Sequence, residues 1–310
     1  MISSCFDIGG TAIKFGLIDE TGRFRKKGSL PTEAQTEGGP GIVHKVCSLI
    51  QRQLTDHPLE GIGLSTAGII DTERGSIDYA LSIPGYTGTD WKGILEKEFH
   101  LPCIVENDTN CAALGEWWLG AGRDMASLFA VTVGTSIGGA FIENGHILHG
   151  ASRAAGEIAY MRVPAGRLHD VASATYLCRE TARQKAADPE KVDGHKVFQF
   201  VRQGDASALA ALDAFCQNLA DGLANIACLC NPDGIVLGGG IMAQEAILRP
   251  RLEQALAARL PKMMLPPKGL AFAQRQNDAG MLGALYLLQQ KSKLLMIQFG
   301  ADDAGNFFID

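Results

Sequence analysis

The sequence predicts an α/β protein built from two related lobes. A chain of 310 residues exceeds the length at which one hydrophobic core usually stops growing. Short apolar segments with strand character alternate with segments whose apolar residues recur at helical spacing. A strand, a glycine-rich bend and a second strand occur at 2–18 and again, about 125 residues later, at 128–142. The repeat indicates that the two lobes share one supersecondary unit.

The composition is that of an ordinary globular protein and excludes several function classes. Hydrophobic residues make up 46% and charged residues 20% of the chain. A net charge of −6 argues against a general binder of nucleic acid or anionic membranes. The eight cysteines lie mostly in apolar runs, and the C-x-C at Cys228 and Cys230 lacks the second ligand pair of a zinc site. Without a signal peptide or a long apolar run, we expect a cytoplasmic protein.

The first glycine bend, between apolar strands, has the residues of a phosphate-binding hairpin. Gly9 and Gly10 let backbone amides approach an anion closely. Thr11 adds a hydroxyl, Lys14 adds a positive charge, and Asp7 at the strand end can hold Mg²⁺ through water. The motif is not a Walker loop, because its sequence differs and a strand follows it. An ordinary hairpin turn is the alternative interpretation.

The next segments predict a helix over 41–54 after a loop over 36–40, and a buried strand over 61–64. That strand leads into Ser65, Thr66, Ala67 and Gly68, whose backbone amides can lie beside a polar ligand. A plain β-turn would have the same residues. A loop over 82–91 and a short helix over 94–100 follow.

A strand over 102–105 ends in polar residues, and a helix is expected over 109–120. Asp108 at this junction is a candidate general base that accepts the proton of an attacking hydroxyl. Asn107 can hydrogen-bond a neighbouring hydroxyl. The alternative is structural, because Asp is a good residue for the N-cap of a helix.

The second glycine bend begins with Gly134, Thr135 and Ser136, which follow the strand over 128–133. Because it repeats the first bend, we expect each lobe to contribute one phosphate-binding turn to a single cleft. Further on, Glu157 and Tyr160 have the spacing of one helical face and could bind adjacent hydroxyls of a polyol. A solvated Glu and a core Tyr would show the same spacing.

Gly239 and Gly240 follow a buried strand over 235–237, where glycines let a base and ribose lie against the backbone or simply allow a tight turn. The tail over 291–310 receives no functional interpretation. The remaining apolar patterns predict helices over 172–185, 196–202, 206–229, 245–260 and 281–290.

Five ordered motifs together resemble the ROK family (repressors, open reading frames, kinases). The resemblance covers residues 1 to about 290. It implies an actin-like, ribonuclease-H-like two-lobed ATPase fold with a ligand cleft between the lobes. The implied lobes are 1–106, completed by the helix 281–290, and 107–280. The motifs are Asp7-Ile8-Gly9-Gly10-Thr11, Glu106-Asn107-Asp108, Gly134-Thr135-Ser136-Ile137-Gly138-Gly139, Gly156-Glu157 and Gly238-Gly239-Gly240.

The resemblance implies ATP-dependent phosphorylation of a sugar hydroxyl, with Asp108 as base and ATP and Mg²⁺ as cofactors. Asp7 is the residue implied for Mg²⁺, through water. The residues expected to bind the nucleotide are Asp7, Gly9, Gly10, Thr11, Lys14, Gly134, Thr135, Ser136, Gly239 and Gly240. The residues expected to bind the sugar are Ser65, Thr66, Ala67, Gly68, Asn107, Glu157 and Tyr160.

Two departures from the family pattern bear on the substrate. Tyr160 stands where typical members have a His that binds sugar and a structural zinc, and the segment 161–178 lacks the cysteine cluster. We therefore expect no structural zinc. His169 and Asp170 occupy the neighbourhood of the family's sugar-binding Glu. The pattern is similar to the β-glucoside-kinase-like branch, so we expect the 6-hydroxyl of a hexose or β-glucoside to be phosphorylated. The alternatives are an N-acetylmannosamine or N-acetylglucosamine kinase and a glucokinase.

Two non-enzymatic alternatives come from the same family. A ROK repressor carries a helix-turn-helix before the first hairpin, whereas only six residues precede Asp7. A sensor that has lost catalysis would not need the retained Asp108. We expect a homodimer that binds a small sugar, with no nucleic-acid or membrane partner.

Overall fold

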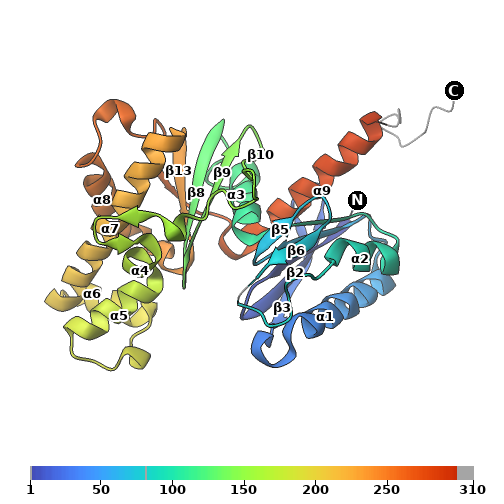
Figure 1. Ribbon diagram of the computed structural model, residues 1–310, viewed down its shortest axis with the longest axis horizontal. Helices are drawn as coiled ribbons and strands as arrows, with labels where there is room; N and C mark the ends of the chain where they lie inside the picture. The colour runs from blue at the N-terminus through green and yellow to red at the C-terminus, as the bar shows by residue number, and fades with distance from the viewer. Residues whose placement is uncertain (1, 81, 299–310) are drawn as a thin grey trace. The chain divides into compact units, whose positions relative to one another are not determined.

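The computed structural model describes residues 2–80 and 82–298 (Figure 1). Of the tail predicted over 291–310, residues 299–310 lie outside this description. Residues 291–298 belong to a helix, α9 (Ala279–Gln298), which extends well beyond the predicted end at residue 290. Within the described residues, no helix is long and apolar enough to cross a membrane.

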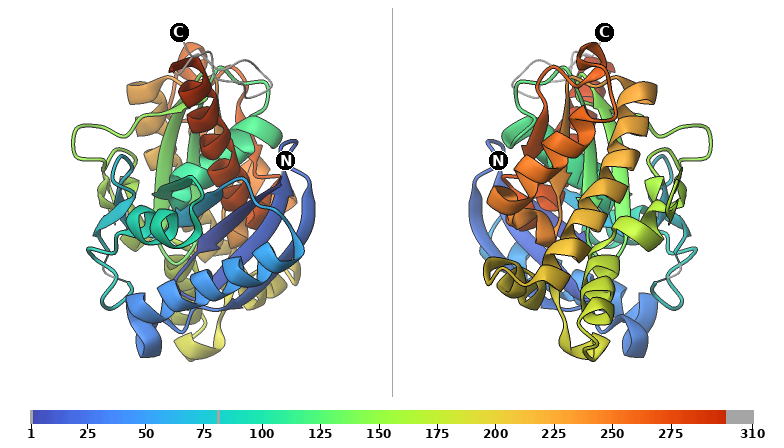
Figure 2. Two further views of the ribbon diagram at one scale, coloured as in Figure 1. Left: turned by 90° about the vertical axis from the view of Figure 1, so that its right-hand side faces the viewer. Right: turned by 90° about the vertical axis from the view of Figure 1, so that its left-hand side faces the viewer.

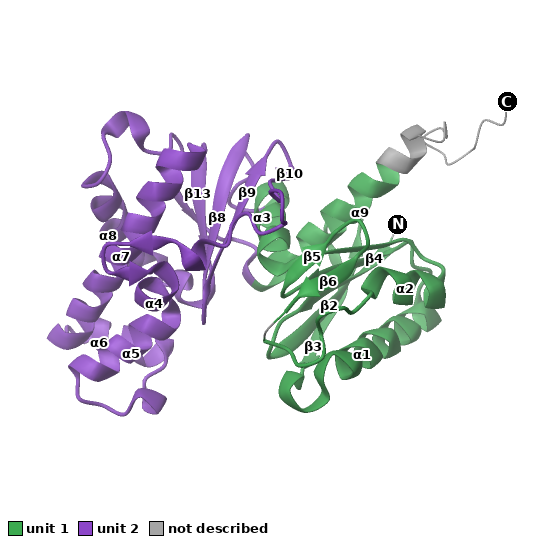
Figure 3. Cartoon of the chain, in the orientation of Figure 1, with its two compact units in different colours: residues 1–119, 277–310 green, residues 120–276 purple. Residues whose placement is uncertain are grey.

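The chain forms two compact units (Figure 3). The first contains Met1–Leu119 and the segment that begins at Asn277, and the second contains Gly120–Gln276. The division was predicted at 106/107, whereas α3 (Asp108–Leu119) belongs to the first unit. The reason is the close packing of α3 on α9. A Cβ atom at Gly115 would overlap the carbonyl of Ala279, and one at Gly283 would overlap that of Cys111.

The first unit is built on a five-stranded sheet with the order β3-β2-β1-β4-β7. Strands β1, β2 and β3 are antiparallel, whereas β1, β4 and β7 are parallel. A small antiparallel pair, β5 and β6, lies outside this sheet. Besides α3 and α9, the unit contains β1 (Ile2–Ile8), β2 (Ala12–Asp19), β3 (Phe24–Pro31), α1 (Ala34–Asp56), β4 (Ile62–Thr66), β5 (Ile69–Asp71), β6 (Ser76–Tyr79), α2 (Trp91–Phe99) and β7 (Cys103–Asn107).

Helices cover both faces of this sheet because its central strands are apolar on both sides. In β1, Phe6 and Ile8 belong to the cluster that includes Val46 of α1. Cys5, which alternates with them, belongs to a second cluster with Leu282 of α9. Figure 2 shows α1 running along the strands of the first unit.

Helix α1 begins earlier than predicted, because the predicted loop over 36–40 is a kink within it. Gly38 has φ 59° and ψ −163°, which is not helical. The backbone N–H of Gly39 donates to the carbonyl of Pro84 at 2.8 Å. A Cβ atom at Gly38 would lie 2.6 Å from that same oxygen. The kink therefore lets the loop before α2 pack against α1.

The second unit repeats the strand order of the first, with β10-β9-β8-β13-β14. Strands β8 and β9 form an antiparallel hairpin, and β13 and β14 continue the sheet in parallel. This shared order agrees with the repeat seen in the sequence. The elements are β8 (Ser127–Val133), β9 (Ile137–Glu143), β10 (His146–Ile147), β11 (Arg162–Val163), β12 (Gly166–Arg167), α4 (Leu168–Ala172), α5 (Ala174–Gln184), α6 (Gly194–Arg202), α7 (Ala206–Cys230), β13 (Gly234–Gly238), α8 (Glu245–Ala257) and β14 (Leu270–Phe272).

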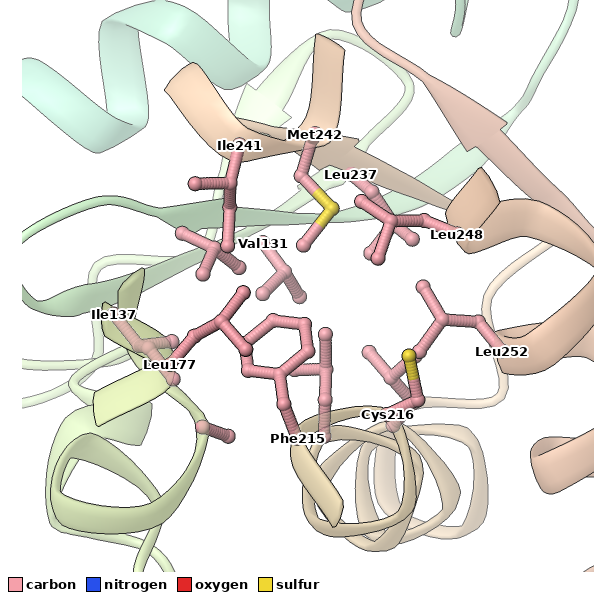
Figure 4. Packing of buried hydrophobic residues seen from close by; sticks show 14 of the residues in the cluster. Val131, Ile137, Leu177, Phe215, Cys216, Leu237, Ile241, Met242, Leu248 and Leu252 are labelled. Carbon is pink, nitrogen blue, oxygen red and sulfur yellow. The ribbon is translucent and has the colours of Figure 1, made fainter. Parts of the chain in front are cut away.

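The core of the second unit lies between its sheet and helices α5, α7 and α8 (Figure 4). Phe215 of α7 is fully buried among residues from the sheet, including Val131 and Leu237. Leu177 of α5 and Leu252 of α8 close this cluster on either side. The right-hand view of Figure 2 shows α7 and α8 side by side.

The helix predicted over 172–185 is α5, and a separate short helix, α4, ends directly before it at Ala172. Ser173 has an extended backbone, and its hydroxyl accepts a hydrogen bond from the N–H of Tyr176 at 3.1 Å. It is thus the N-cap of α5.

A buried chain of hydrogen bonds fixes the loop that precedes α2. Tyr86 and Trp91 are fully buried, and the indole N–H of Trp91 donates to the Tyr86 hydroxyl at 2.9 Å. That hydroxyl lies 2.6 Å from Thr66 Oγ1 in β4. Burial raises the pKa of the Tyr86 phenol, which therefore stays protonated.

We expect Tyr86→Phe to lower the free energy of unfolding by about 1–3 kcal/mol, because it leaves the Trp91 N–H buried without an acceptor. Urea unfolding measures this change. Tyr79→Phe is the matched control, since Tyr79 is 50% exposed and its replacement should change the same quantity by about 0.5 kcal/mol or less. Equal effects of the two substitutions would show that the buried chain does not stabilise the loop.

Candidate functional site

Three parallel strands of the first unit end side by side and bring the predicted residues to one edge of the sheet. In the strand register Asp7 lies beside Ser65, and Ser65 lies beside Glu106. One residue further on, Thr66 lies beside Asn107. Asp108 is the next residue and the first of α3. Because carboxyl ends of parallel strands share one edge, ligands of such sheets bind there.

Asp7 is partly buried and held by two side chains. Lys14 Nζ lies 3.0 Å from Asp7 Oδ2, so the two predicted residues form an ion pair across the hairpin. The Ser65 hydroxyl donates to Asp7 Oδ1 at 2.9 Å. At Gly280, in the first turn of α9, a Cβ atom would lie 2.8 Å from Asp7 Oδ1. Only glycine therefore lets α9 begin this close to the carboxylate.

The first hairpin presents a bend of small residues at the end of β1. The N–H of Gly9 donates to the carbonyl of Ala12 at 3.1 Å, which closes the bend. Gly10 and Thr11 are exposed. Thr32, which follows β3, is fully buried and contacts this bend from the side.

Asn107, and not Asp108, caps α3. The Asn107 Oδ1 accepts hydrogen bonds from the N–H groups of Thr109 at 2.9 Å and Asn110 at 3.2 Å. Asp108 is already helical, and its Oδ1 accepts from the N–H of Thr109 at 2.7 Å. The role of N-cap, which was the structural alternative for Asp108, is thus filled by Asn107.

The segment Ser65, Thr66, Ala67 and Gly68 begins inside a strand and not after it. β4 continues to Thr66, and the side chains of Ser65 and Thr66 are fully buried. Their hydroxyls contact Asp7 and Tyr86, respectively. Gly68 has φ 119°, and its carbonyl accepts from Asn107 Nδ2 at 2.9 Å. The buried pair therefore supports the edge, and Ala67 and Gly68 form the turn beyond it.

The electrostatics of a buried cysteine agree with this arrangement. Burial, followed by the negative charge of Glu106, raises the pKa of the Cys111 thiol. The carboxylates of Asp7 and Asp108 raise this pKa as well. The two predicted carboxylates thus both raise the pKa of Cys111 in α3, as expected if they lie at the same edge of the sheet.

The second hairpin is held from one side by the start of α5. The carbonyl of Gly134 accepts from the N–H of Ala174 at 2.9 Å, and that of Thr135 accepts from the Thr175 hydroxyl at 3.0 Å. Ser136 Oγ lies 2.8 Å from His169 Nδ1. Thr135 and Ser136 are exposed.

Gly239 lies next to this hairpin. It has φ 100°, and a Cβ atom there would overlap the carbonyl of Val133, the last residue of β8. Gly240 is exposed, and a Cβ atom there would meet no atom within 4 Å. The two predicted glycines and the second hairpin therefore share one edge of the second sheet.

Glu157 and Tyr160 both lie on the surface of the second unit. Gly156 has φ 91°, and a Cβ atom there would overlap the carbonyl of Gly139 in β9. A 3₁₀ turn over Ile158–Tyr160 follows, with Ile158 buried. Glu157 is exposed, and 66% of the Tyr160 surface is exposed. Tyr160 is thus not the core residue that its spacing also allowed.

The segment over 161–178, where no zinc cluster was expected, folds through backbone pairing. β11 pairs with β12, and Leu168 N–H donates to the carbonyl of Met161 at 2.8 Å. The described residues contain no group of three or more His, Cys, Asp or Glu that could hold a metal ion. The absence of structural zinc stays a prediction.

The structure thus groups the predicted residues into one set in each unit. Three features that were not predicted from the sequence lie against predicted residues: Thr32, Gly280 and the Tyr86–Trp91 pair. For Gly280 a signal existed, because a glycine in the first turn of an apolar helix is costly unless a close approach requires it. Thr32 and Tyr86 carry no such signal.

The two units have the same strand order, and each has a glycine hairpin between its first two strands. This is the arrangement of the actin-like ATPase fold, which the chain shares with its structural neighbours. Within this class the chain belongs to the ROK family, whose model matches residues 3–291.

Several relatives are named as sugar kinases. The chain is 35% identical to a glucokinase of Halalkalibacterium halodurans, over 92% of this chain and 94% of that protein. It is 31% identical to a beta-glucoside kinase of Listeria monocytogenes, over 94% of this chain and 98% of that one. The crystal structure of a ROK family glucokinase from Streptomyces griseus, in complex with glucose and AMPPNP, matches with a TM-score of 0.79 and 26% identity, covering 94% of this chain and 100% of that one.

Proposed function

We propose that this protein is an ATP-dependent sugar kinase that phosphorylates the 6-hydroxyl of a hexose or β-glucoside. The observation that carries the proposal is the register of β1, β4 and β7, which aligns Asp7 with the strand end that leads to Asp108. A carboxylate beside a glycine hairpin and a second carboxylate at the same edge suit phosphoryl transfer, which needs a base and a clamp for phosphates. The glucose and AMPPNP in the Streptomyces griseus structure support the choice of ligands.

The residues of both units have distinct roles in the proposed reaction. Asp108 accepts the proton of the sugar hydroxyl, whose oxygen forms a bond to the γ-phosphorus of ATP. The bond between this phosphorus and the β–γ bridging oxygen breaks, and ADP leaves. The hairpins at Gly9–Thr11 and Gly134–Ser136 would hold the phosphates through backbone N–H groups and hydroxyls.

Sugar hydroxyls would be held by residues that have donors or acceptors to spare. An amide nitrogen carries two donors, so Asn107 can serve Gly68 with one and a sugar hydroxyl with the other. Glu157 and Tyr160 are exposed and can turn toward a ligand. Ala67 and Gly68 would contribute backbone groups.

Asp7 fits the Mg²⁺ that a kinase uses. Mg²⁺ keeps several of its waters and is usually held by one or two carboxylates together with substrate phosphates, so a single carboxylate suffices. Asp7, which is partly buried at the end of β1, would hold the ion through water. When bound, Mg²⁺ would neutralise charge that develops on the phosphates. The proposal includes a cytoplasmic location, where ATP is at hand.

An assay coupled to ADP formation, run across hexoses, N-acetylhexosamines and β-glucosides, tests the proposal. We expect ATP turnover that depends on both Mg²⁺ and a sugar, with the phosphate recovered on the sugar. A protein that binds sugars but turns over none of them would instead be the non-catalytic sensor. The screen also tests the N-acetylmannosamine, N-acetylglucosamine and glucose alternatives.

A further inference from the structure

Thr32 holds the backbone on both sides of the first glycine bend. It follows β3 directly, and its side chain is fully buried. Its hydroxyl donates to the carbonyl of Gly9 at 2.7 Å, and its backbone N–H donates to the carbonyl of Thr11 at 3.0 Å. One residue just beyond β3 thus holds the Gly9–Gly10 peptide and the Thr11–Ala12 peptide, one on each side of the bend.

Because the peptide bond is planar, the hydrogen bond from Thr32 to the Gly9 carbonyl also sets the direction of the Gly10 N–H. In a trans peptide the C=O and the N–H point in opposite directions. The carbonyl of Gly9 shares its plane with the N–H of Gly10, so Thr32 directs this N–H away from itself. Gly10 is exposed, and a Cβ atom there would meet nothing within 4 Å. Glycine has wide backbone freedom, so the orientation of this N–H depends on what holds its neighbours.

Thr32 is itself held in place by α1. Lys45 Nζ donates to the carbonyl of Thr32 at 3.1 Å. The same ammonium group forms ion pairs with Glu33 at 2.5 Å and with Glu37 at 3.0 Å. The hydroxyl of Thr32 therefore belongs to a fixed part of the first unit and not to a mobile side chain.

We propose that Thr32 is a positioning residue for the nucleotide, which aims the Gly10 N–H at a phosphate oxygen without contacting the ligand. The inference rests on the proposed function, because that function identifies the anion at this bend as a nucleotide phosphate. It predicts that Thr32 contributes to nucleotide affinity and not to sugar affinity.

The test compares three substitutions by titration calorimetry with ADP and Mg²⁺, and by the KM for ATP and for the sugar. Thr32→Val keeps the shape and removes the donor, whereas Thr32→Ser retains it. Thr181→Val is the matched control, since Thr181 is also fully buried and its hydroxyl donates to a backbone carbonyl, that of Leu177, at 2.8 Å. We expect Thr32→Val to weaken ADP binding about tenfold, the loss for one such hydrogen bond. Thr32→Ser and Thr181→Val should stay within about twofold of wild type, and the sugar KM should hardly change.

A purely structural role would appear differently. It would lower the unfolding midpoint of Thr32→Val without a selective loss of ADP, or raise both KM values together, and either result would overturn the proposal. So would a Thr32→Ser protein that binds ADP as weakly as Thr32→Val. Wild-type protein that binds ADP but phosphorylates no sugar would count against the proposed function alone, because the calorimetric comparison needs no turnover.

Discussion

Replacement of Asp108 by Asn is expected to lower kcat by about 10²- to 10⁴-fold, the usual contribution of a positioned general base. An amide nitrogen cannot take the proton of the sugar hydroxyl, so the attacking oxygen stays a poor nucleophile. The substitution retains Oδ1, the atom that accepts from the N–H of Thr109, and the N-cap belongs to Asn107. We therefore expect α3 to form normally.

Steady-state kinetics and an unfolding curve check this expectation together. KM for ATP and for the sugar should stay within a few-fold of wild type, because the lost interaction acts on the proton in the transition state. Asp124→Asn is the control for the same chemical change at an exposed carboxylate and should leave kcat unchanged. If folded Asp108→Asn protein turned over at nearly the wild-type rate, the base would have to be another residue.

The placement of most candidate residues at one edge of each sheet could be predicted because its signals are local. Each hairpin is a glycine bend between two apolar strands, and Asp7 and Asn107 each lie at a strand end. A strand end can be recognised from a few residues. Parallel strands then bring their carboxyl ends to the same edge of the sheet. The repeated strand order could likewise be expected from the repeated hairpin.

The parts that could not be predicted depend on contacts between distant segments. Gly280 and Asp7 meet only when α9 packs on the first sheet, and Thr32 meets Gly9 only when β3 pairs with β2. Asp108 was considered as an alternative N-cap of α3, whereas Asn107 fills this role; the two residue types cap helices about equally well, so the sequence could not distinguish them. β5 and β14 have three residues each and are too short to show the alternation of apolar and polar residues that marks a strand. The early division at 106/107 missed the packing of α3 on α9.

The second large effect concerns the choice of sugar, and it centres on Tyr160. Its phenol is 66% exposed at the end of a turn that Gly156 holds against β9. An exposed aromatic ring can stack on a sugar ring or substituent, and its hydroxyl can bond a sugar hydroxyl. We expect kcat/KM for cellobiose to exceed that for glucose by at least about tenfold.

Two substitutions at this position separate the ring from its hydroxyl. Tyr160→Ala removes both and should lower kcat/KM for cellobiose by roughly 10²-fold, with a smaller loss for glucose. Tyr160→Phe keeps the ring and should recover most of that loss if stacking dominates. Neither change should affect folding, because the side chain is exposed. Measuring kcat/KM for glucose, cellobiose, N-acetylmannosamine and N-acetylglucosamine side by side decides the matter. Glucose as the best substrate would overturn the role given to Tyr160, whereas an acetamido sugar as the best substrate would mean that the space beside this ring accommodates an N-acetyl group.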